Sequence, residues 1–194
     1  MRLAKPTEFE THSCAFVDLL APRAEDIDLV DVVFSLAKTC RFTGHPKGHY
    51  SVAQHSCFVA NLLPEQHRIH GLVHDMPKFG MGDLSSPMKL ALARVCPEFK
   101  PAWRAIEDGL FRAIYERIGI PMPTDEVRDL VKKADLVALA TEKRDVMLSP
   151  NAWNLPYPPS PRTIRPVASR AAVWMLADAL DECGVKVGGV FNFS

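Results

Sequence analysis

The sequence lacks the features that mark secreted, membrane-embedded and polyanion-binding proteins. Its five cysteines are widely spaced and never form a Cys-x-x-Cys pair, which argues against a disulfide framework or a cysteine zinc site and favours a reducing compartment. No apolar run approaches the roughly 18 residues of a membrane-spanning helix, and residues 1–10 contain no apolar signal segment. The 23 basic and 23 acidic residues cancel, which leaves no net charge to attract a polyanion. We therefore expect a cytoplasmic protein, in the host cytoplasm if it is viral, that binds neither a nucleic-acid polymer nor a membrane.

Apolar residues at helical spacing dominate the rest of the chain. In residues 28–40, Leu29, Val32, Val33 and Leu36 form one stripe. Similar patterns predict further helices, the longest of them N-capped by Thr124 or Asp125; they cover residues 51–63, 65–76, 103–119, 125–148 and 168–184. Polar or proline-marked segments read as connectors, and two short segments suit strands; the connectors are 41–50, 77–89 and 149–166, and the strands are 14–20 and 188–193.

The length of 194 residues suits one well-buried core. We expect a single all-α domain over residues 1–194, with at most a small β element at its edge. The proline-rich segment and final helix, within residues 149–194, should pack on the rest of that domain.

Four residues stand out by type and placement: His55, the adjacent His74 and Asp75, and Asp135. Each falls in a predicted helix, and Asp135 shares a helix face with Val131, Ala138 and Glu142 by three-and-four spacing. A carboxylate beside an apolar stripe is costly without a partner. A divalent cation bound by all four would satisfy them together, because imidazole and carboxylate are suitable ligands for such ions. Taken one at a time, however, a helical histidine is more often a hydrogen-bonded core residue, and a mid-helix aspartate is more often exposed or salt-bridged.

The order and flanks of these residues favour the metal site. The segments "DIDLVDVVFSLAKTCRFTGH", "HYSVAQHS", "GLVHDMPKFGMGDLSSPMK" and "KKADLVALATEKRDVM" follow one another in the chain. They resemble, in the same order, the motif segments of the HD-domain metal-dependent phosphohydrolases, in particular the small phage and bacterial deoxynucleotidases. The resemblance covers about residues 17–148, and it implies a compact HD-type helical bundle.

The resemblance also implies roles for particular residues. It makes His55, His74, Asp75 and Asp135 the ligands of a divalent ion, which would be zinc, cobalt, manganese or magnesium. Arg41 and Lys89 match residues that contact substrate phosphate, which suits the affinity of these cations for phosphate oxygens. Phe42 matches an aromatic residue that packs against deoxyribose, and Asp83 matches a pocket aspartate that orients water or a sugar hydroxyl. Without the motif, Arg41 and Lys89 read equally well as surface charges.

Lys78 departs from the family pattern. The nucleotidases usually carry a glutamate at this position, three residues after the HD aspartate, that helps to activate the attacking water. A lysine there could bind phosphate or lower the pKa of bound water, but it is not a carboxylate base at neutral pH unless its own pKa falls. Metal-driven activation, another carboxylate such as Asp83 or Glu142, impaired activity and a lysine in solvent all remain open.

Three catalytic signatures are absent: the Walker loop, the G-x-S-x-G elbow and the dinucleotide fingerprint. Together with the resemblance, this predicts a metal-dependent hydrolase of small-molecule deoxynucleotides, most simply a deoxynucleoside triphosphohydrolase of the phage dATP type. A 5′-deoxynucleotidase, a cyclic-nucleotide or oligonucleotide phosphodiesterase and a catalytically impaired nucleotide-binding protein are the alternatives. The resemblance further implies a homo-oligomer.

Overall fold

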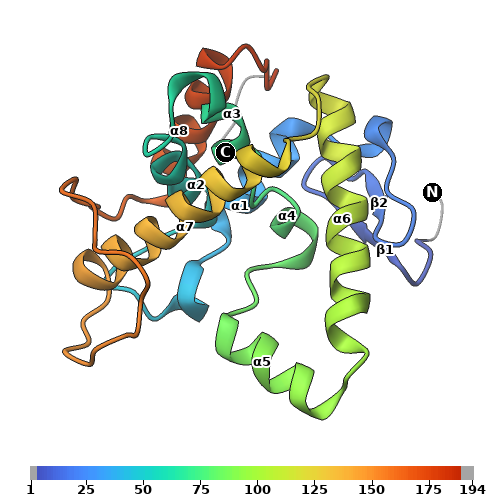
Figure 1. Ribbon diagram of the computed structural model, residues 1–194. Helices are drawn as coiled ribbons and strands as arrows, with labels where there is room; N and C mark the ends of the chain where they lie inside the picture. The colour runs from blue at the N-terminus through green and yellow to red at the C-terminus, as the bar shows by residue number, and fades with distance from the viewer. Residues whose placement is uncertain (1–3, 189–194) are drawn as a thin grey trace.

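The structure is a computed structural model that describes residues 4–188. It is a mostly helical fold in which α1, α2, α3 and α8 gather around one core, α7 crosses in front of them and the long α6 stands beside them (Figure 1). The elements are β1 (Glu8–Glu10), β2 (Phe16–Asp18), η1 (Ala24–Asp26), α1 (Leu29–Lys38), η2 (Arg41–Gly44), α2 (Val52–Ala60), η3 (Glu65–His67), α3 (Arg68–Val73), α4 (Lys78–Met81), α5 (Ser86–Val95), α6 (Phe99–Ile118), α7 (Asp125–Asp145) and α8 (Ser169–Glu182).

The helix starts follow local capping rules. Side-chain oxygens of Asp28, Ser51 and Thr124 accept backbone N–H groups at the starts of α1, α2 and α7. Of the two N-cap candidates for the longest helix, the structure selects Thr124. The apolar stripe of α1 is buried as predicted, because Leu29, Val32, Val33 and Leu36 all lie in the main core.

Several sequence-based assignments were wrong in detail. The helix predicted at 65–76 ends at Val73, because Pro77 has no N–H to continue its hydrogen bonds, so His74 and Asp75 lie just after α3 and not within a helix. Residues 77–89, read as a connector, contain the short helix α4 and the start of α5. The helix predicted at 103–119 begins at Phe99, because Pro101 lies in its first turn, where a missing N–H costs nothing. The strand predicted within 14–20 is confirmed as β2, but it pairs antiparallel with β1, which the sequence analysis missed. The other predicted strand, 188–193, falls almost entirely outside the described residues.

The segment between α7 and α8 runs back over the helices that carry the candidate ligands. The guanidinium of Arg144 donates to the carbonyls of Ser160 and Arg162, and the Gln54 side chain donates to the carbonyl of Arg165. The backbone N–H of Ile164 donates to Asp145. These hydrogen bonds tie the proline-rich segment to α7 and α2.

Two further observations bear on the class of protein. All five cysteines fall within the described residues, and their thiols are free. Among residues 4–188 we find no helix with the length and apolar character needed to cross a bilayer.

Candidate metal centre

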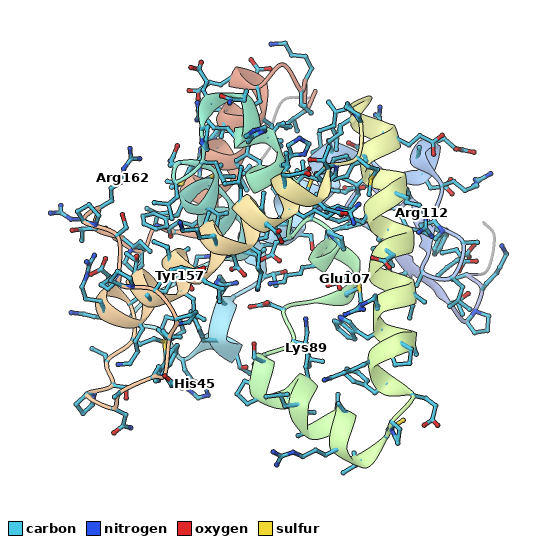
Figure 2. All side chains as sticks on the ribbon, in the orientation of Figure 1. His45, Lys89, Glu107, Arg112, Tyr157 and Arg162 are labelled. Carbon is cyan, nitrogen blue, oxygen red and sulfur yellow. The ribbon has the colours of Figure 1, made fainter. Side chains whose placement is uncertain are left out.

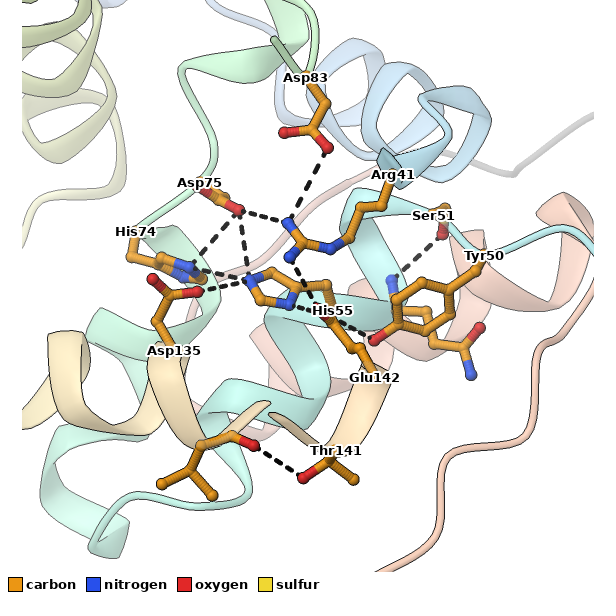
Figure 3. A network of polar contacts seen from close by, with 12 residues as sticks. Arg41, Tyr50, Ser51, His55, His74, Asp75, Asp83, Asp135, Thr141 and Glu142 are labelled. Carbon is orange, nitrogen blue, oxygen red and sulfur yellow. Dashed lines mark hydrogen bonds and ion pairs between the residues drawn. The ribbon is translucent and has the colours of Figure 1, made fainter. Parts of the chain in front are cut away.

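The four predicted ligands meet at one point although they come from three parts of the chain. His55 lies in α2, His74 and Asp75 follow α3 directly, and Asp135 lies in α7 (Figure 3). His55 Nε2 is 3.3 Å from His74 Nε2, 3.4 Å from Asp75 Oδ2 and 3.4 Å from Asp135 Oδ1. His74 Nε2 is 3.5 Å from Asp75 Oδ2. Donor atoms about 2.1 Å from a tetrahedral zinc ion would lie about 3.4 Å apart, so these spacings fit a shared divalent ion.

Each of the two imidazoles is oriented by a hydrogen bond at its Nδ1 atom, which directs its Nε2 atom toward the point where the ligands meet. His74 Nδ1 lies 2.8 Å from the carbonyl oxygen of Gly71, which can only accept, so this nitrogen carries the proton. His55 Nδ1 donates in the same way to the carboxylate of Glu142 at 2.6 Å. Both Nε2 atoms therefore point inward, as the ligating nitrogen of a metal-bound histidine does when a partner holds the other one.

The electrostatics of the cluster favour a positive charge at its centre. Burial alone would raise the pKa of Asp75 and Asp135, but Lys78 and the imidazoles lower the pKa of Asp75, and His55 lowers that of Asp135, so both stay ionised. Burial lowers the pKa of His74. Burial and Arg41 oppose protonation of His55, yet the carboxylates of Glu142 and Asp135 raise its pKa overall. A divalent ion bound there would supply positive charge beside the two ionised carboxylates.

Three of the four residues form the tightest set. Among the described residues, ligand atoms of His55, His74 and Asp135 all lie within 4.8 Å of one another. Asp75 reaches the same point with Oδ2, but that oxygen also accepts from Lys78 Nζ at 2.8 Å and lies 3.7 Å from Arg41 Nη1. The geometry thus offers three ligands directly and a fourth that shares its oxygen with a lysine.

Glu142 is the residue whose place the sequence analysis did not predict. It is fully buried, and its carboxylate accepts from His55 Nδ1, from the Tyr50 hydroxyl at 2.9 Å and from Arg41 Nη2 at 2.9 Å. Burial favours the neutral acid, but Arg41 and His55 lower the pKa of Glu142 to about 2. The carboxylate therefore orients His55 from behind rather than activating water. Its position seven residues after Asp135, on the same helix face, was the signal in the sequence.

Arg41 and Phe42 sit in a turn of unusual backbone. Phe42 and Thr43 both have positive φ, 52° and 56°, which costs roughly 1–3 kcal/mol for each such residue. This turn leaves Arg41 buried, with Nη2 on Glu142 and Nη1 4.0 Å from Asp83. The Arg41 guanidinium also lies over the Phe42 ring, with its Cζ 5.1 Å from the ring centre, and this ring packs against Trp153, with ring centroids 5.9 Å apart. The guanidinium thus already faces the carboxylates of the site.

Lys78 does not point into solvent. Its Nζ lies between Asp75 Oδ2, at 2.8 Å, and Asp83 Oδ1, at 2.6 Å, and its side chain is largely buried. Burial lowers the pKa of Lys78, but the two carboxylates raise it overall, so the side chain stays an ammonium. Lys78 therefore joins the two acids that the sequence analysis placed in the site, and Asp83 faces cations rather than open space.

Lys89 is the predicted substrate residue that the structure places farthest from the cluster. It extends from α5 (Figure 2), and its Nζ lies 5.0 Å from the centre of the Trp103 ring. None of the residues of α5 is buried. Lys89 contacts no candidate ligand, so its proposed contact with phosphate depends on how substrate extends toward α5.

A cavity of about 610 Å³ opens beside the cluster, between α6 and α7. A volume of this size is typical of small-molecule sites. His74, Asp75 and Asp135 form its inner end, whereas Arg41, Phe42, Lys78, Asp83 and Lys89 do not line it. The remaining lining residues are His70, Glu107, Asp108, Phe111, Arg112, Tyr115, Met122, Pro123, Arg128, Val131 and Lys132.

Comparison with known proteins gives relatives but no function. No family model matches the chain. The uncharacterized protein YfdR of Escherichia coli strain K12 is 35% identical over 66% of this chain and 66% of its own length. The uncharacterized protein RCAP_rcc00048 of Rhodobacter capsulatus is 31% identical over 67% of this chain and 68% of its own length. The match thus spans about two thirds of each relative.

Proposed function

The chain belongs to the same protein family as the uncharacterized protein RCAP_rcc00048 of Rhodobacter capsulatus, and from the motif order of its sequence and the geometry of its site we propose a metal-dependent phosphohydrolase of deoxynucleotides. The proposed reaction is hydrolysis of a deoxynucleoside triphosphate, with dATP as the first substrate to test. The proposal places the chain among the HD-domain phosphohydrolases, whose motif order its sequence resembles.

One observation carries this proposal. The Nε2 atoms of His55 and His74 face each other at 3.3 Å, with oxygens of Asp75 and Asp135 beside them, and outer hydrogen bonds hold both imidazoles in this orientation. Four groups that ligate metals therefore converge at the inner end of a cavity. A divalent ion bound there would lower the pKa of a water molecule and offset charge on phosphoryl oxygens.

The other residues of the site act on charge and orientation. Glu142 holds His55 in its ligating orientation, and Arg41 neutralises Glu142. Lys78 keeps Asp75 ionised and adds positive charge near the phosphoryl group, which compensates in part for the missing glutamate. Because Lys78 stays an ammonium, it cannot accept a proton from the attacking water, and a bound divalent ion would supply the activation of that water.

Product analysis tests the proposal. The full-length protein, stripped of metal and reloaded separately with Co²⁺, Mn²⁺, Zn²⁺ or Mg²⁺, is incubated with the four dNTPs, the four dNMPs and a cyclic dinucleotide. We expect deoxynucleoside and inorganic triphosphate from a dNTP, with no turnover after chelation or in Asp135→Ala. Orthophosphate from dNMPs alone would indicate a 5′-deoxynucleotidase, and cleavage of the cyclic dinucleotide alone a phosphodiesterase. Chelator-resistant hydrolysis would refute the metal-dependent mechanism.

Lys78 supports a second candidate, a protein that binds nucleotide without hydrolysing it. Lys78 lies between two carboxylates, at a position where the HD-domain nucleotidases usually have a glutamate that helps to activate the attacking water. If this candidate holds, the metal-loaded protein binds dATP without turnover, and Lys78→Glu restores hydrolysis. Turnover by the unmodified protein would eliminate it.

A further inference from the structure

Cationic side chains of α7 form a row that leads away from the candidate metal. Arg128, Lys132 and Asp135 lie on one face of α7 at spacings of four and three residues, and all three line the cavity. At 1.5 Å per residue, Lys132 is about 4.5 Å and Arg128 about 10.5 Å along the helix axis from Asp135. The two cations therefore lie at increasing distance from the point where the ligands converge.

Both cations are exposed and only weakly engaged. Lys132 Nζ lies 2.8 Å from Asp135 Oδ2, with the lysine side chain 65% exposed. Arg128 Nε donates to the carbonyl of Pro123 at 3.2 Å, and its Nη1 is 3.9 Å from the exposed carboxylate of Asp125. The pair of Arg128 with Asp125 is exposed on both sides and contributes little to stability. Asp135 is 24% exposed, but a metal ion bound by this carboxylate would replace Lys132 as its counter-charge, so both cations could turn to a phosphate at small cost.

The cations on the inner side of the site are in a different position. Arg41 and Lys78 are largely buried, and their nitrogens face Glu142, Asp75 and Asp83. A phosphate that recruited either of them would leave a buried carboxylate unpaired, which is costly. The cations of α7 are therefore better placed than Arg41 to hold a chain of phosphates.

The wall of the cavity formed by α6, opposite α7, carries mainly acidic and aromatic side chains. Residues of α6 contribute the carboxylates of Glu107 and Asp108, the ring of Phe111 and a single cation, Arg112. Glu107 lies on the side of α6 turned toward α7 (Figure 2). Carboxylates accept hydrogen bonds from amino and hydroxyl groups and repel phosphates. A molecule with an anionic chain and an uncharged ring that carries donors would be oriented between these walls.

We propose that the face of α7 formed by Lys132 and Arg128 is a binding subsite for the outer phosphates of a nucleoside polyphosphate. The phosphate to be cleaved lies at the inner end, the next phosphate contacts Lys132, and the last contacts Arg128, while the nucleoside faces α6. This inference rests on the metal site of the proposed function, and it deepens that function by naming the residues that would distinguish a triphosphate from a monophosphate.

The test compares anions that differ only in chain length. Tripolyphosphate and orthophosphate are titrated into the Mn²⁺-loaded full-length protein by isothermal calorimetry, with the variants Arg128→Gln and Lys132→Gln. The matched control is Lys133→Gln, because this neighbouring lysine of α7 is outside the cavity lining and lies over the Tyr157 ring.

We expect Arg128→Gln to weaken the binding of tripolyphosphate about tenfold, which is the effect of one lost charge-assisted hydrogen bond. The affinity for orthophosphate should stay within about twofold of that of the unmodified protein. Lys132→Gln should weaken the binding of tripolyphosphate to a similar degree, and Lys133→Gln should bind both anions as tightly as the unmodified protein does. Equal losses for both anions in Arg128→Gln, or no difference from the control, would overturn the inference.

The outcome is separable from that of the proposed function, because neither titration needs turnover. Metal titration of each sample without anion reports on the metal site itself. Hydrolysis of dATP at an unchanged KM in Arg128→Gln would refute the phosphate subsite alone. Tripolyphosphate binding that depends on Arg128, in a protein that hydrolyses no nucleotide, would refute the hydrolase and leave the subsite in place.

Discussion

Replacement of Glu142 by glutamine should destabilise the protein markedly, although the two side chains have nearly the same shape. The carboxylate accepts hydrogen bonds from His55, Tyr50 and Arg41 and is fully buried. A glutamine oxygen can still accept from His55 and Tyr50, but its NH₂ group would then face Arg41 Nη2, donor against donor. Glu142→Gln therefore removes the main counter-charge of a buried guanidinium.

The magnitude follows from what remains around Arg41. Removal of one partner of a buried ion pair costs about 3–5 kcal/mol. Asp75 and Asp83 lie 3.7 and 4.0 Å from Arg41 Nη1 and compensate in part, so we expect about 3 kcal/mol, at the low end of that range. In a protein of this length, that loss lowers Tm by about 6–12 °C. The outer acceptor of His55 would also become neutral, so we expect metal binding to weaken by about 10-fold, at the low end of the range for outer partners of a metal ligand.

The assay is thermal and denaturant unfolding of the metal-free protein, since bound metal would add its own stabilisation. Tyr50→Phe is the matched control, because it removes a neutral donor from the same carboxylate and should cost only about 1 kcal/mol. Metal affinity is then measured by calorimetry on the folded variants. If Glu142→Gln is no less stable than Tyr50→Phe, the buried charge pair does not have the role that its geometry indicates, and the reasoning fails.

The remaining predictions concern the metal and the packing around it. His74→Ala should abolish metal binding with little change in the far-ultraviolet circular dichroism; full metal stoichiometry in this variant would contradict the site. Chelation of a metal present at a hundredfold its Kd should lower the free energy of unfolding by about 2.7 kcal/mol, which corresponds to a fall in Tm of about 5–11 °C. An unchanged Tm would mean that no metal binds the folded state. Gly71→Ala would bring its Cβ within 2.7 Å of the Ala60 Cα, so we expect a loss of about 1–3 kcal/mol in urea unfolding. A Cβ at Gly109, in α6, would meet only Pro22, at ordinary van der Waals distance, so Gly109→Ala should raise the free energy of unfolding by up to about 1 kcal/mol. A change of the same sign in both variants would contradict the packing argument.

Helices with a buried stripe could be predicted from the sequence, whereas the four-residue helix α4 and the exposed helix α5 could not. The apolar stripe of α1 and the cap at Thr124 are local signals, and the structure confirms both. Helix α5 was missed because none of its residues is buried, so it has no stripe to detect. Its start at Ser86-Pro87 was read as part of the connector 77–89, although proline is well suited to the first turn of a helix. The strand β1 is only three residues long and depends on its partner β2.

For the site, the sequence could indicate residue types but not their environment. His55, His74, Asp75 and Asp135 were identified by their order and flanks, and the structure brings them together. Lys78 was recognised as a departure, but its position between two carboxylates was not predictable from its neighbours in the chain. The cavity lined by Arg128 and Lys132 was not anticipated, since both residues look like ordinary charges on the outside of a helix.

The sequence by itself determined the mostly helical class, the main helix starts and the candidate ligands, because periodicity, capping and residue type act over a few neighbouring positions. Only the tertiary structure decided that Arg41 pairs with Glu142, 101 positions away, and that the same carboxylate accepts a hydrogen bond from His55. The physical reason is desolvation: a charge removed from water must find a partner in space, and that partner depends on how distant helices pack.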